Sequence, residues 1–430
     1  MKPITIALIG AGLRGMRYSE YASKRPREMK IVAVAEPNDF KRERAKAAFN
    51  IPEEKCFKSW DELFAAGKQA DAVFVCTQDR DHYVPAMKAM EAGYHVMLEK
   101  PMSPSWKECI ELERTAEKHN RILTICHVLR YAPFFQTIKQ LLDDGRIGRL
   151  MSIQHNENVG YWHQAHSFVR GYFNNTEKSS PMILAKSCHD MDIIQWFAGG
   201  KCTNVSSYGH LSYFNMQNAP EGAPKYCLDG CPVEDSCVYY APNTYLIENG
   251  GWKAEAASAD PSYEARYKAI KEGPFGRCVF QCDNDVVDHQ VVAMDFDNEV
   301  TVAFTMSAFT EKTSRTLRLM GTIGEIRATM ETNEIEIRTF GAGRSEVIKL
   351  EEAAGHEGHG GGDSRLVQDF ARTVRAWELG QGVKVSQTSA KESVQSHLMA
   401  FAAERSRVEK RMIQLEEFYK EGNYYENSYI

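Results

Sequence analysis

The first 126 residues alternate short apolar runs with longer stretches whose apolar residues recur at helical spacing. The runs are rich in Val, Ile and Leu and are short enough to be buried strands. Strands that alternate with helices in this way form βαβ units, in which the strands are parallel. The pattern therefore predicts a doubly wound parallel α/β sheet with strands at 4–9, 31–35, 71–76, 95–99 and 121–126.

The rhythm changes after this region. A helix is expected at 131–145, and the following runs are longer and alternate between apolar and polar positions, as in antiparallel strands. Asp297-Asn298 and Gly321–Gly324 are typical of turns between such strands. We expect a second, α+β domain with an open, mostly antiparallel sheet. Its strands are predicted at 150–159, 202–214, 286–296, 299–309, 315–321 and 334–340, followed by helices at 364–378 and 388–410.

A glycine-rich turn follows the first strand directly. In the sequence Gly10-Ala-Gly12-Leu13-Arg14-Gly15, the first glycine permits a tight turn and the second permits close approach of a pyrophosphate. The third glycine lets the next helix pack closely on the strand, and the helix N-terminus offers free N–H groups to phosphates. An ordinary βα turn is the alternative, but the position at the start of a parallel sheet favours a dinucleotide.

The second strand ends at an acidic residue. Glu36 lies 21 residues beyond Gly15, where a carboxylate accepts hydrogen bonds from the adenosine ribose. A carboxylate repels a 2′-phosphate, so we expect NAD as the cofactor, with NADP disfavoured. Lys41, Arg42 and Arg44 follow closely and either relax this choice or form the solvated face of a helix.

Two further segments are expected at the carboxyl edge of the first sheet, where open α/β sheets bind ligands. The loop from Thr77 to His82 follows the strand at 71–76. Glu99, Lys100 and Pro101 follow the strand that begins at His95, and proline stops that strand. We therefore predict that Thr77, His82, Glu99 and Lys100 lie near the cofactor.

Composition narrows the functional class. The 430 residues are 43% hydrophobic and 26% charged, as in ordinary globular proteins, and the net charge of −6 argues against nucleic acid as a partner. Apolar runs fall short of the roughly 20 residues that cross a bilayer, so we expect no membrane partner. The chain opens with a predicted strand rather than a signal peptide, and its 11 cysteines suit a reducing cytoplasm.

The length predicts two domains rather than one. Within the second domain, the glycine-rich stretch His356–Asp363 predicts a flexible loop, and His359 and Asp363 are candidates to close over a pocket. We expect a dinucleotide-binding Rossmann domain at 1–127, a substrate and oligomerisation domain at 128–410, a polar insertion at about 218–262, and a tail at 411–430.

Together these motifs resemble the Gfo/Idh/MocA family of sugar and polyol oxidoreductases, and within it a YteT-type subgroup associated with plant-polysaccharide breakdown. The resemblance implies a sugar held between the domains over the nicotinamide, and homodimers or homotetramers formed through the open sheet. The motifs that carry it are Gly10-x-Gly12-x-x-Gly15, Thr77 to His82, Gly93 through Glu99-Lys100-Pro101, Arg130-Tyr131-x-Pro133 and Cys188-His189-Asp190-Met-Asp192.

The resemblance assigns the proton chemistry to two residues. It implies that Lys100 contacts the cofactor and a substrate hydroxyl, that His189 relays the proton, and that Arg130 and Tyr131 lie on the substrate side. The family's aspartate four residues before the histidine is replaced here by Ala185, and Lys186 stands beside it. We hypothesise that Lys186 binds or polarises a substrate oxygen, and a histidine satisfied at a helix start remains the alternative for His189.

Residues 156–170 are crowded with groups that suit sugars. Tyr161 and Trp162 offer faces that stack on C–H bonds, and His163, His166 and Arg170 offer donors to hydroxyls or a carboxylate. The alternative is a loop whose aromatic side chains only pack on the second domain. We predict a substrate-binding role for the cluster.

The insertion carries closely spaced cysteines. Cys227, Cys231 and Cys237 do not follow the usual zinc-knuckle spacing, although Cys278 and Cys282 could complete a set of ligands. A structural zinc and a group of free cytosolic thiols are both compatible with this pattern, and free thiols are preferred.

The sequence leaves three functions open. The first is an NAD(H)-dependent oxidoreductase that transfers a hydride between nicotinamide and a hydroxyl of a sugar, glycoside or polyol. The second is a redox-neutral enzyme that oxidises a glycoside, eliminates the aglycone, adds water and reduces the product. The third is a cofactor-bound sugar sensor without catalysis. Retention of Lys100 beside a complete glycine turn favours an enzyme.

Overall fold

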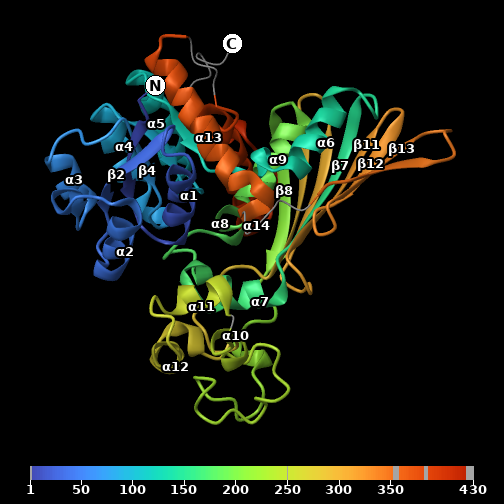
Figure 1. Ribbon diagram of the computed structural model, residues 1–430. Coiled ribbons are helices and arrows are strands. Elements are labelled where there is room, and N and C mark those ends of the chain that lie inside the picture. Colours follow the sequence, from blue (N-terminus) through green and yellow to red (C-terminus); the bar gives the residue numbers. More distant parts are fainter. Residues whose placement is uncertain (1, 249, 352–357, 382–385, 423–430) are drawn as a thin grey trace.

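The computed structural model describes residues 2–248, 250–351, 358–381 and 386–422. The first domain is built on a parallel sheet of order β3-β2-β1-β4-β5-β6, shown in blue and cyan in Figure 1. The order reverses beside β1, which places the glycine turn at the point where α/β folds bind ligands. The strands are β1 (Ile4–Ile9), β2 (Met29–Ala35), β3 (Cys56–Phe57), β4 (Ala72–Val75), β5 (His95–Leu98) and β6 (Leu123–Ile125).

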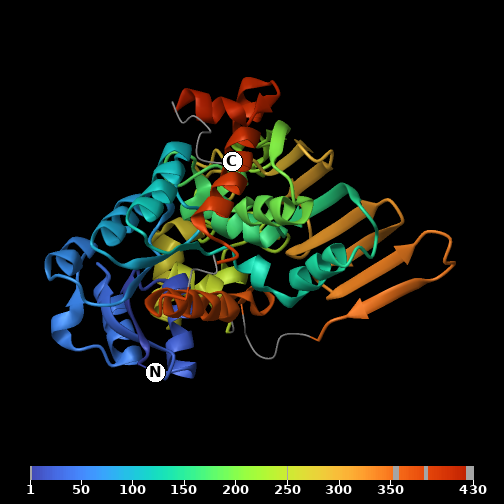
Figure 2. The same ribbon diagram turned by 90° about the horizontal axis from the view of Figure 1, so that it is seen from above.

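Helices cover both faces of this sheet (Figures 1 and 2). Both β4 and β5 are buried along their whole length, which explains their unbroken apolar sequences. The Asn38 side chain caps the start of α2 by accepting the Lys41 N–H. Ser59 caps the start of α3 in the same way, because its hydroxyl accepts the Glu62 N–H. The helices are α1 (Leu13–Lys24), α2 (Asp39–Phe49), α3 (Trp60–Ala65), α4 (Tyr83–Glu91) and α5 (Trp106–Lys118).

The second domain contains a mixed sheet of order β14-β13-β12-β11-β7-β10-β9-β8-β15. Its strands pair antiparallel except β7 with β10, which run parallel. The strands are β7 (Leu150–Asn158), β8 (Cys202–His210), β9 (His289–Phe296), β10 (Thr301–Ser307), β11 (Ser314–Gly321), β12 (Gly324–Thr329), β13 (Glu334–Thr339), β14 (Ser345–Lys349) and β15 (Ile413–Gln414).

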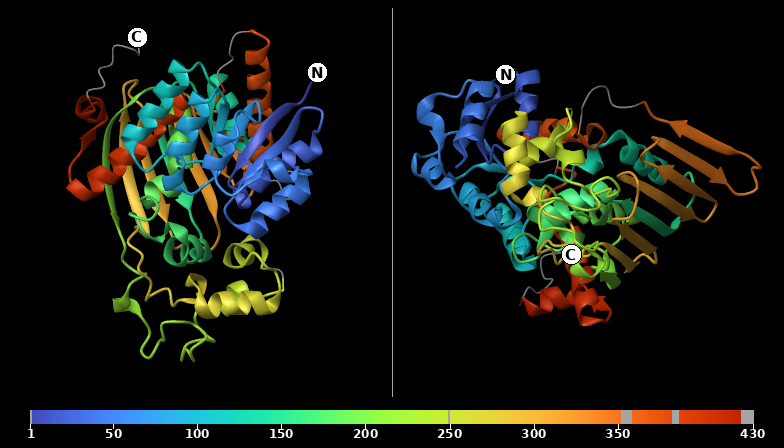
Figure 3. Two further views of the ribbon diagram at one scale, coloured as in Figure 1. Left: turned by 90° about the vertical axis from the view of Figure 1, so that its left-hand side faces the viewer. Right: turned by 90° about the horizontal axis from the view of Figure 1, so that it is seen from below.

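One face of this sheet packs on helices and the other is open. In β9 and β10 buried and exposed residues alternate along each strand, as the sequence predicted for a sheet with one wet face. Figures 1 and 3 show α6, α9 and α14 on one side of the strands. These helices are α6 (Pro133–Asp143), α8 (Met182–Ala185), α9 (Cys188–Ala198), α14 (Ala390–Glu409) and, after β15, α15 (Glu416–Glu421).

Residues 211–288 form an insertion between β8 and β9, longer than the 218–262 expected from composition. It hangs below the two sheets and reaches under the first domain (Figures 1 and 3). Its helices are α10 (Pro242–Tyr245), α11 (Gly251–Ala257) and α12 (Tyr263–Glu272). The segment just after β7 lies against it and forms α7 (Tyr161–His163) and a π-helix (Gln164–Arg170).

Helix α13 (Gly358–Glu378) returns to the first domain after β14, and the chain then goes back to the second sheet to form β15. Its Leu366, Phe370 and Val374 share a buried cluster with residues of β1, including Ile6 and Leu8. Gly362 at its start permits this packing, because a Cβ there would lie 2.1 Å from the Val128 carbonyl oxygen. The glycine-rich stretch therefore packs in part against the first domain, and its residues 356 and 357 lie outside the described residues.

The predicted fold class is confirmed: a Rossmann-type parallel sheet and a mostly antiparallel second sheet. The hairpin at Asp297-Asn298 and the turn at 321–324 both occur. Strands β12 and β14 were not anticipated, and residues 423–430 of the expected tail lie outside the described residues. Among the described helices, none combines the length and the apolar character required to cross a membrane.

Candidate active site between the two domains

The glycine turn has the shape that a pyrophosphate requires. Gly10 has a φ of +89°, and a Cβ there would lie 2.5 Å from the Cys76 carbonyl oxygen. A Cβ on Gly15 would lie 2.1 Å from the Gly10 carbonyl oxygen, so strand and helix pack tightly. At Gly12 a Cβ would meet nothing within 4 Å. Space is therefore left at the one glycine where a dinucleotide approaches the backbone, and NAD fits the turn.

Glu36 lies beside this turn at the end of β2. Its carboxylate accepts the Ala11 N–H at 2.8 Å and the Asn38 N–H at 3.0 Å. Arg42 is buried and donates to the Glu36 carbonyl oxygen, so it is not on a solvated helix face. Arg44 reaches the turn itself and donates to the Ala11 carbonyl oxygen at 3.2 Å. The Glu36 carboxylate therefore lies against the glycine turn, with the Arg44 guanidinium at the carbonyl of the same turn.

The Arg14 side chain points away from the turn and links three elements. It donates to Glu99 after β5 at 2.8 Å, to the Tyr18 hydroxyl at 2.6 Å and to both carboxylate oxygens of Asp363 in α13. Burial alone raises the pKa of Glu99, but the Arg14 charge outweighs it and leaves that pKa below the ordinary value. Glu99 is therefore ionised and holds the start of the Glu-Lys-Pro segment.

The loop after β4 is fixed to the same segment. The His82 imidazole lies with Nδ1 2.7 Å from the Pro101 carbonyl oxygen and Nε2 3.1 Å from the Thr77 carbonyl oxygen. Asp79 in this loop is buried and accepts the Ser180 hydroxyl at 2.8 Å, a contact with the second domain. The peptide bond between Lys100 and Pro101 is cis. His82 thus positions the backbone around Lys100.

Lys100 crosses the boundary between the domains. Its ammonium donates to the Ala185 carbonyl oxygen at 2.8 Å, at the C-terminal end of α8, where helix carbonyls lack helical partners. Among the described residues no carboxylate lies within ion-pair distance of this ammonium. Ala185, which stands where the family has an aspartate, is therefore next to Lys100, but it offers a backbone carbonyl oxygen instead of a carboxylate.

Three histidines with buried ring nitrogens, His127, His163 and His189, surround this point. Burial, reinforced by the Lys100 charge, lowers the pKa of His189 well below its ordinary value, and burial does the same for His163 beside Lys186. Nδ1 of both rings, and both nitrogens of His127, have no hydrogen-bond partner among the described residues. The His127 and His189 rings lie 5.9 Å apart. Neutral imidazoles with free nitrogens can exchange protons with hydroxyl groups.

Lys186 belongs to a buried charged network between α8 and α9. Its Nζ lies 3.2 Å from Glu157 in β7, and the other Glu157 oxygen lies 2.6 Å from Arg315 in β11. Arg315 also pairs with Asp190 at 2.7 Å, and Asp190 lies 2.8 Å from His155. Burial lowers the pKa of Lys186 and raises that of Glu157, although their mutual attraction opposes both shifts.

Comparison with protein-family models decides the affiliation. The model described as the oxidoreductase family, NAD-binding Rossmann fold, matches residues 4–127, and that described as its C-terminal alpha/beta domain matches residues 139–415. The chain belongs to the Gfo/Idh/MocA family. It is thus an NAD-binding oxidoreductase by family, and the resemblance of its motifs is confirmed.

Individual relatives are distant. The oxidoreductase YteT of Bacillus subtilis is 26% identical over 73% of this chain and 74% of its own length. An inositol 2-dehydrogenase of Corynebacterium glutamicum is 26% identical over 47% of this chain and 57% of its own. A 2,7-anhydro-N-acetylneuraminate hydratase of Mediterraneibacter gnavus is 28% identical over 49% and 53%. The chain thus spans little more than half the length of the last two.

Solved structures share the fold across the whole chain. An oxidoreductase from Agrobacterium radiobacter, solved with NAD+, L-tartaric acid and magnesium, has a TM-score of 0.70 at 15% identity, covering 97% of this chain and all of its own. An inositol dehydrogenase homologue from Azotobacter vinelandii, solved with NADH and myo-inositol, has a TM-score of 0.67 at 15% identity, covering 96% and 98%. Identity this low establishes the Gfo/Idh/MocA fold alone.

Two residues of the family motif after β6 are engaged in structural contacts. Arg130 forms a buried bidentate pair with Asp192, at 2.7 and 2.8 Å. The Tyr131 hydroxyl donates to Asp369 of α13 at 2.8 Å. Because each polar group already has a buried partner, these two residues hold helices together in this structure, and their predicted contact with substrate stays untested.

The aromatic segment after β7 divides into two parts. Trp162 and His163 stack with ring centroids 5.3 Å apart and lie toward Lys186. Tyr161 and Arg170 face the insertion instead: Tyr161 packs on Tyr239. His166 lies between the two parts, with Nδ1 2.9 Å from the Tyr245 hydroxyl. The structure brings only part of the predicted substrate cluster together with the catalytic candidates.

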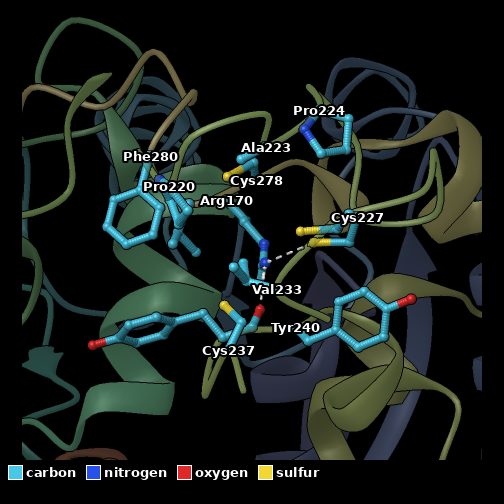
Figure 4. Close-up of a pocket in the computed structure, with 13 residues that line it drawn as sticks. Arg170, Pro220, Ala223, Pro224, Cys227, Val233, Cys237, Tyr240, Cys278 and Phe280 are labelled. Atoms are coloured by element: carbon cyan, nitrogen blue, oxygen red, sulfur yellow. Dashed lines mark hydrogen bonds between the residues drawn. The ribbon is translucent and has the colours of Figure 1, made fainter. Parts of the chain in front are cut away.

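Arg170 holds the cysteine-bearing part of the insertion. Its guanidinium donates to the carbonyl oxygens of Arg277 and Tyr239, each at 2.7 Å, and lies 3.6 Å from the Cys227 sulfur. Figure 4 shows that the guanidinium reaches into a pocket lined by cysteines. The lining cysteines are Cys227, Cys231, Cys237 and Cys278.

This arrangement gives the zinc hypothesis no support. A guanidinium, rather than an open centre, lies among the sulfurs. In the described parts of the chain, no group of three or more His, Cys, Asp or Glu side chains is arranged to hold a metal ion. None of the cysteines of this part forms a disulfide.

Sequence reasoning missed two residues of the site that carried detectable signals. His127 follows β6 directly, so the rule that ligands bind at strand carboxyl ends applied to it as it did to Thr77. Glu157 shares the buried face of β7 with Ile153 and His155. An acid on a core-facing strand position requires a buried partner, which is a signal of function or of a structural ion pair.

Proposed function

We propose that this chain is an NAD(H)-dependent oxidoreductase that transfers a hydride between nicotinamide and a hydroxyl-bearing carbon of a sugar, glycoside or polyol. The observation that carries the proposal is the position of Lys100. This lysine lies just after β5 of the first sheet and donates to the Ala185 carbonyl oxygen of the second domain. It is close to histidines such as His189, whose pKa is lowered by burial and by the Lys100 charge. Relatives named as inositol dehydrogenases support the same class of chemistry.

When bound, NAD+ supplies the acceptor for the hydride. Oxidation of an alcohol also releases the hydroxyl proton, and a general base within hydrogen-bond reach accelerates that release. Lys100 and His189 are the groups that we assign to this proton. The Lys100 ammonium holds the substrate oxygen, gives one of its protons to His189 and takes the hydroxyl proton in its place. His189 can accept that proton because its Nδ1 has no partner among the described residues.

Substrate hydroxyls require several donors and acceptors besides the base. Lys186 lies between α8 and α9 with its charge balanced by Glu157, so it can donate to a substrate oxygen. Gln164 is buried and both atoms of its amide lack partners among the described residues. It lies in a π-helix, a local geometry that is frequent at functional sites. These groups and His163 would orient the sugar.

The test follows reduction of the cofactor. Purified protein is mixed with NAD+ or NADP+ and a panel of polyols, monosaccharides and glycosides, and absorbance at 340 nm and aglycone release are both recorded. We expect NADH in proportion to oxidised substrate, with NAD+ preferred because the Glu36 carboxylate beside the glycine turn would repel a 2′-phosphate. Sugar binding without any reduction or aglycone release would support a sensor instead.

A second candidate function is favoured by the Lys186–Glu157 pair. A redox-neutral glycosidase removes one proton from the sugar hydroxyl during oxidation and a second proton from the carbon beside the new carbonyl during elimination. It therefore requires two separate acid–base centres. Lys100 and Lys186 are two such centres, each with its own partner. Aglycone release by the wild type without net NADH would establish this function if Lys186→Met lost aglycone release but still reduced NAD+ to NADH.

The open sheet face suits assembly. Tyr208 and Val291, on adjacent strands β8 and β9, are exposed on it. We propose a homodimer or homotetramer formed through this face, as the family resemblance implies. Light scattering of the purified protein measures the assembly directly, and a monomer would contradict it.

A further inference from the structure

The insertion places a tryptophan next to the candidate active site. Trp252 of α11 lies with its ring centroid 5.6 Å from His163, 4.9 Å from His166 and 6.1 Å from Trp162. Helix α11 lies beside α7 where the insertion meets the second domain (Figure 1). One aromatic cluster therefore joins the insertion to the segment that carries His163.

His163 connects this cluster to the reacting groups. Burial lowers the pKa of His163, and its ring is close enough to Lys186 and Lys100 that both charges help to lower this pKa. Its buried Nδ1 has no hydrogen-bond partner among the described residues. The ring of Trp162 is covered on one side by Lys253, whose Nζ lies 4.6 Å from the centroid. Trp252 is 42% exposed and thus presents the open aromatic surface of the cluster.

Packing of the insertion does not account for Trp252. The buried core of α10–α12 consists of Cys227, Ala241, Tyr245 and Ile270, with partly buried neighbours that do not include this tryptophan. The other core of the insertion, built around Phe214, Tyr239 and Phe280, does not include it either. A large exposed aromatic side chain that stabilises neither core is a candidate for ligand binding.

We propose that Trp252 forms a subsite for a second sugar ring, so that the substrate is a glycoside of at least two rings rather than a free monosaccharide. The inference rests on the proposed function, because it extends the same site outward. The C–H face of a pyranose packs on an exposed indole, and the Lys253 ammonium over the neighbouring Trp162 ring would donate to ring hydroxyls. The ring that is oxidised then lies toward His163 and Lys186, and the second sugar ring lies on Trp252.

The test compares matched sugars that share one ring. Methyl β-D-glucoside is paired with cellobiose, and methyl β-D-galactoside with lactose. Calorimetry on protein saturated with NADH, which cannot oxidise the sugar, gives the binding constants, and NADH formation from NAD+ gives KM and kcat. We expect wild type to bind a disaccharide about tenfold more tightly than its methyl glycoside, and Trp252→Ala to abolish that difference while leaving the methyl glycoside unaffected.

Two controls separate stacking from folding. Trp252→Phe keeps an aromatic face and should retain part of the preference. Tyr267→Ala removes another exposed aromatic side chain of the insertion, 38% exposed on α12 and outside the cluster, and should change nothing. Equal binding of one-ring and two-ring sugars by wild type, or equal losses for both in Trp252→Ala, would overturn the subsite. Disaccharide binding that depends on Trp252 without any hydride transfer would overturn the proposed function and keep the subsite.

Discussion

The partner of Lys100 determines what this residue can do. A carboxylate partner would engage Lys100 in an ion pair, whereas Lys100 donates to the backbone carbonyl of Ala185. The replacement of the family's aspartate by Ala185 therefore leaves Lys100 available to bind a substrate hydroxyl.

Lys186 offers the first prediction. Lys186→Met removes one cation from the network but leaves Glu157 paired with Arg315 at 2.6 Å, so the protein should fold. We expect turnover to fall by about 10²-fold or more with NAD+ affinity unchanged, because the lost group handles substrate rather than cofactor. Steady-state kinetics and cofactor fluorescence titration measure the two quantities.

Lys58→Met, at an exposed lysine of the first domain, serves as the control for this substitution. Unchanged kcat and KM in Lys186→Met would show that the Lys186–Glu157 pair is only structural.

Individual side chains were harder to predict than motifs. Arg130 and Arg170 belong to segments that the sequence assigned to substrate, and both guanidinium groups are satisfied within the protein, by Asp192 and by backbone carbonyls of the insertion. The sequence shows that an arginine is present but not which distant acceptor folding brings to it. Their substrate-binding roles stay predictions.

At the scale of elements, the glycine turn allows two substitutions, at Gly12 and Gly15, to be compared. Gly12→Ala adds a Cβ that meets no protein atom within 4 Å, whereas in Gly15→Ala the Cβ lies 2.1 Å from the Gly10 carbonyl oxygen. The first variant should fold like wild type and bind NAD+ roughly tenfold more weakly, because the methyl group occupies space that the pyrophosphate needs. The second should lose thermal stability.

Thermal melting and NAD+ titration of the two variants decide the point. If Gly12→Ala bound NAD+ as tightly as wild type, the pyrophosphate would not lie against this glycine.

The elements were predictable to the extent that local patterns determine them. All the long strands of the parallel sheet follow from apolar runs, and α6, α13 and α14 from helical periodicity. Strand β14 was missed because its residues are mostly exposed at the edge of the sheet, so no apolar alternation marks it. The insertion was underestimated because its cores depend on contacts between distant segments, such as Tyr239 with Phe280.

On the scale of the whole molecule, the site depends on contacts between the domains. Lys100 with Ala185, Asp79 with Ser180, and Arg14 with Asp363 all join the first domain to later parts of the chain. None of these pairs is visible in local sequence, since their members are 85 or more residues apart. The two domains therefore assemble the site jointly, and the pairs fix how they meet.

Global stability should depend on pH through buried histidines. Burial, with the charges of Arg121 and Lys68, lowers the pKa of His95 to about 4. The unfolded chain takes up a proton near pH 6.5, which the folded protein does not, so stability falls as the pH drops from 6.5 toward 4. His95 alone should cost about 2 kcal/mol of unfolding free energy between pH 7.5 and 5.0.

Urea unfolding at the two pH values measures this loss. His95→Gln keeps an acceptor for the Ile122 N–H, which His95 Nδ1 now accepts at 3.1 Å, but it cannot titrate. The loss between pH 7.5 and 5.0 should therefore shrink by about 2 kcal/mol in His95→Gln and not in His119→Gln, a partly exposed control. The same pH dependence in wild type and His95→Gln would contradict the assignment.

The central claim is that Lys100 handles the proton while the Rossmann domain holds NAD. The most direct test measures NADH formation at 340 nm and NAD+ binding in Lys100→Met and Lys100→Arg, with the best substrate found for wild type. We predict unchanged folding and near-normal NAD+ affinity, with kcat lowered by about 10²- to 10⁴-fold in both variants, because neither methionine nor arginine can exchange the proton. NADH formation at the wild-type rate in Lys100→Met would contradict the account.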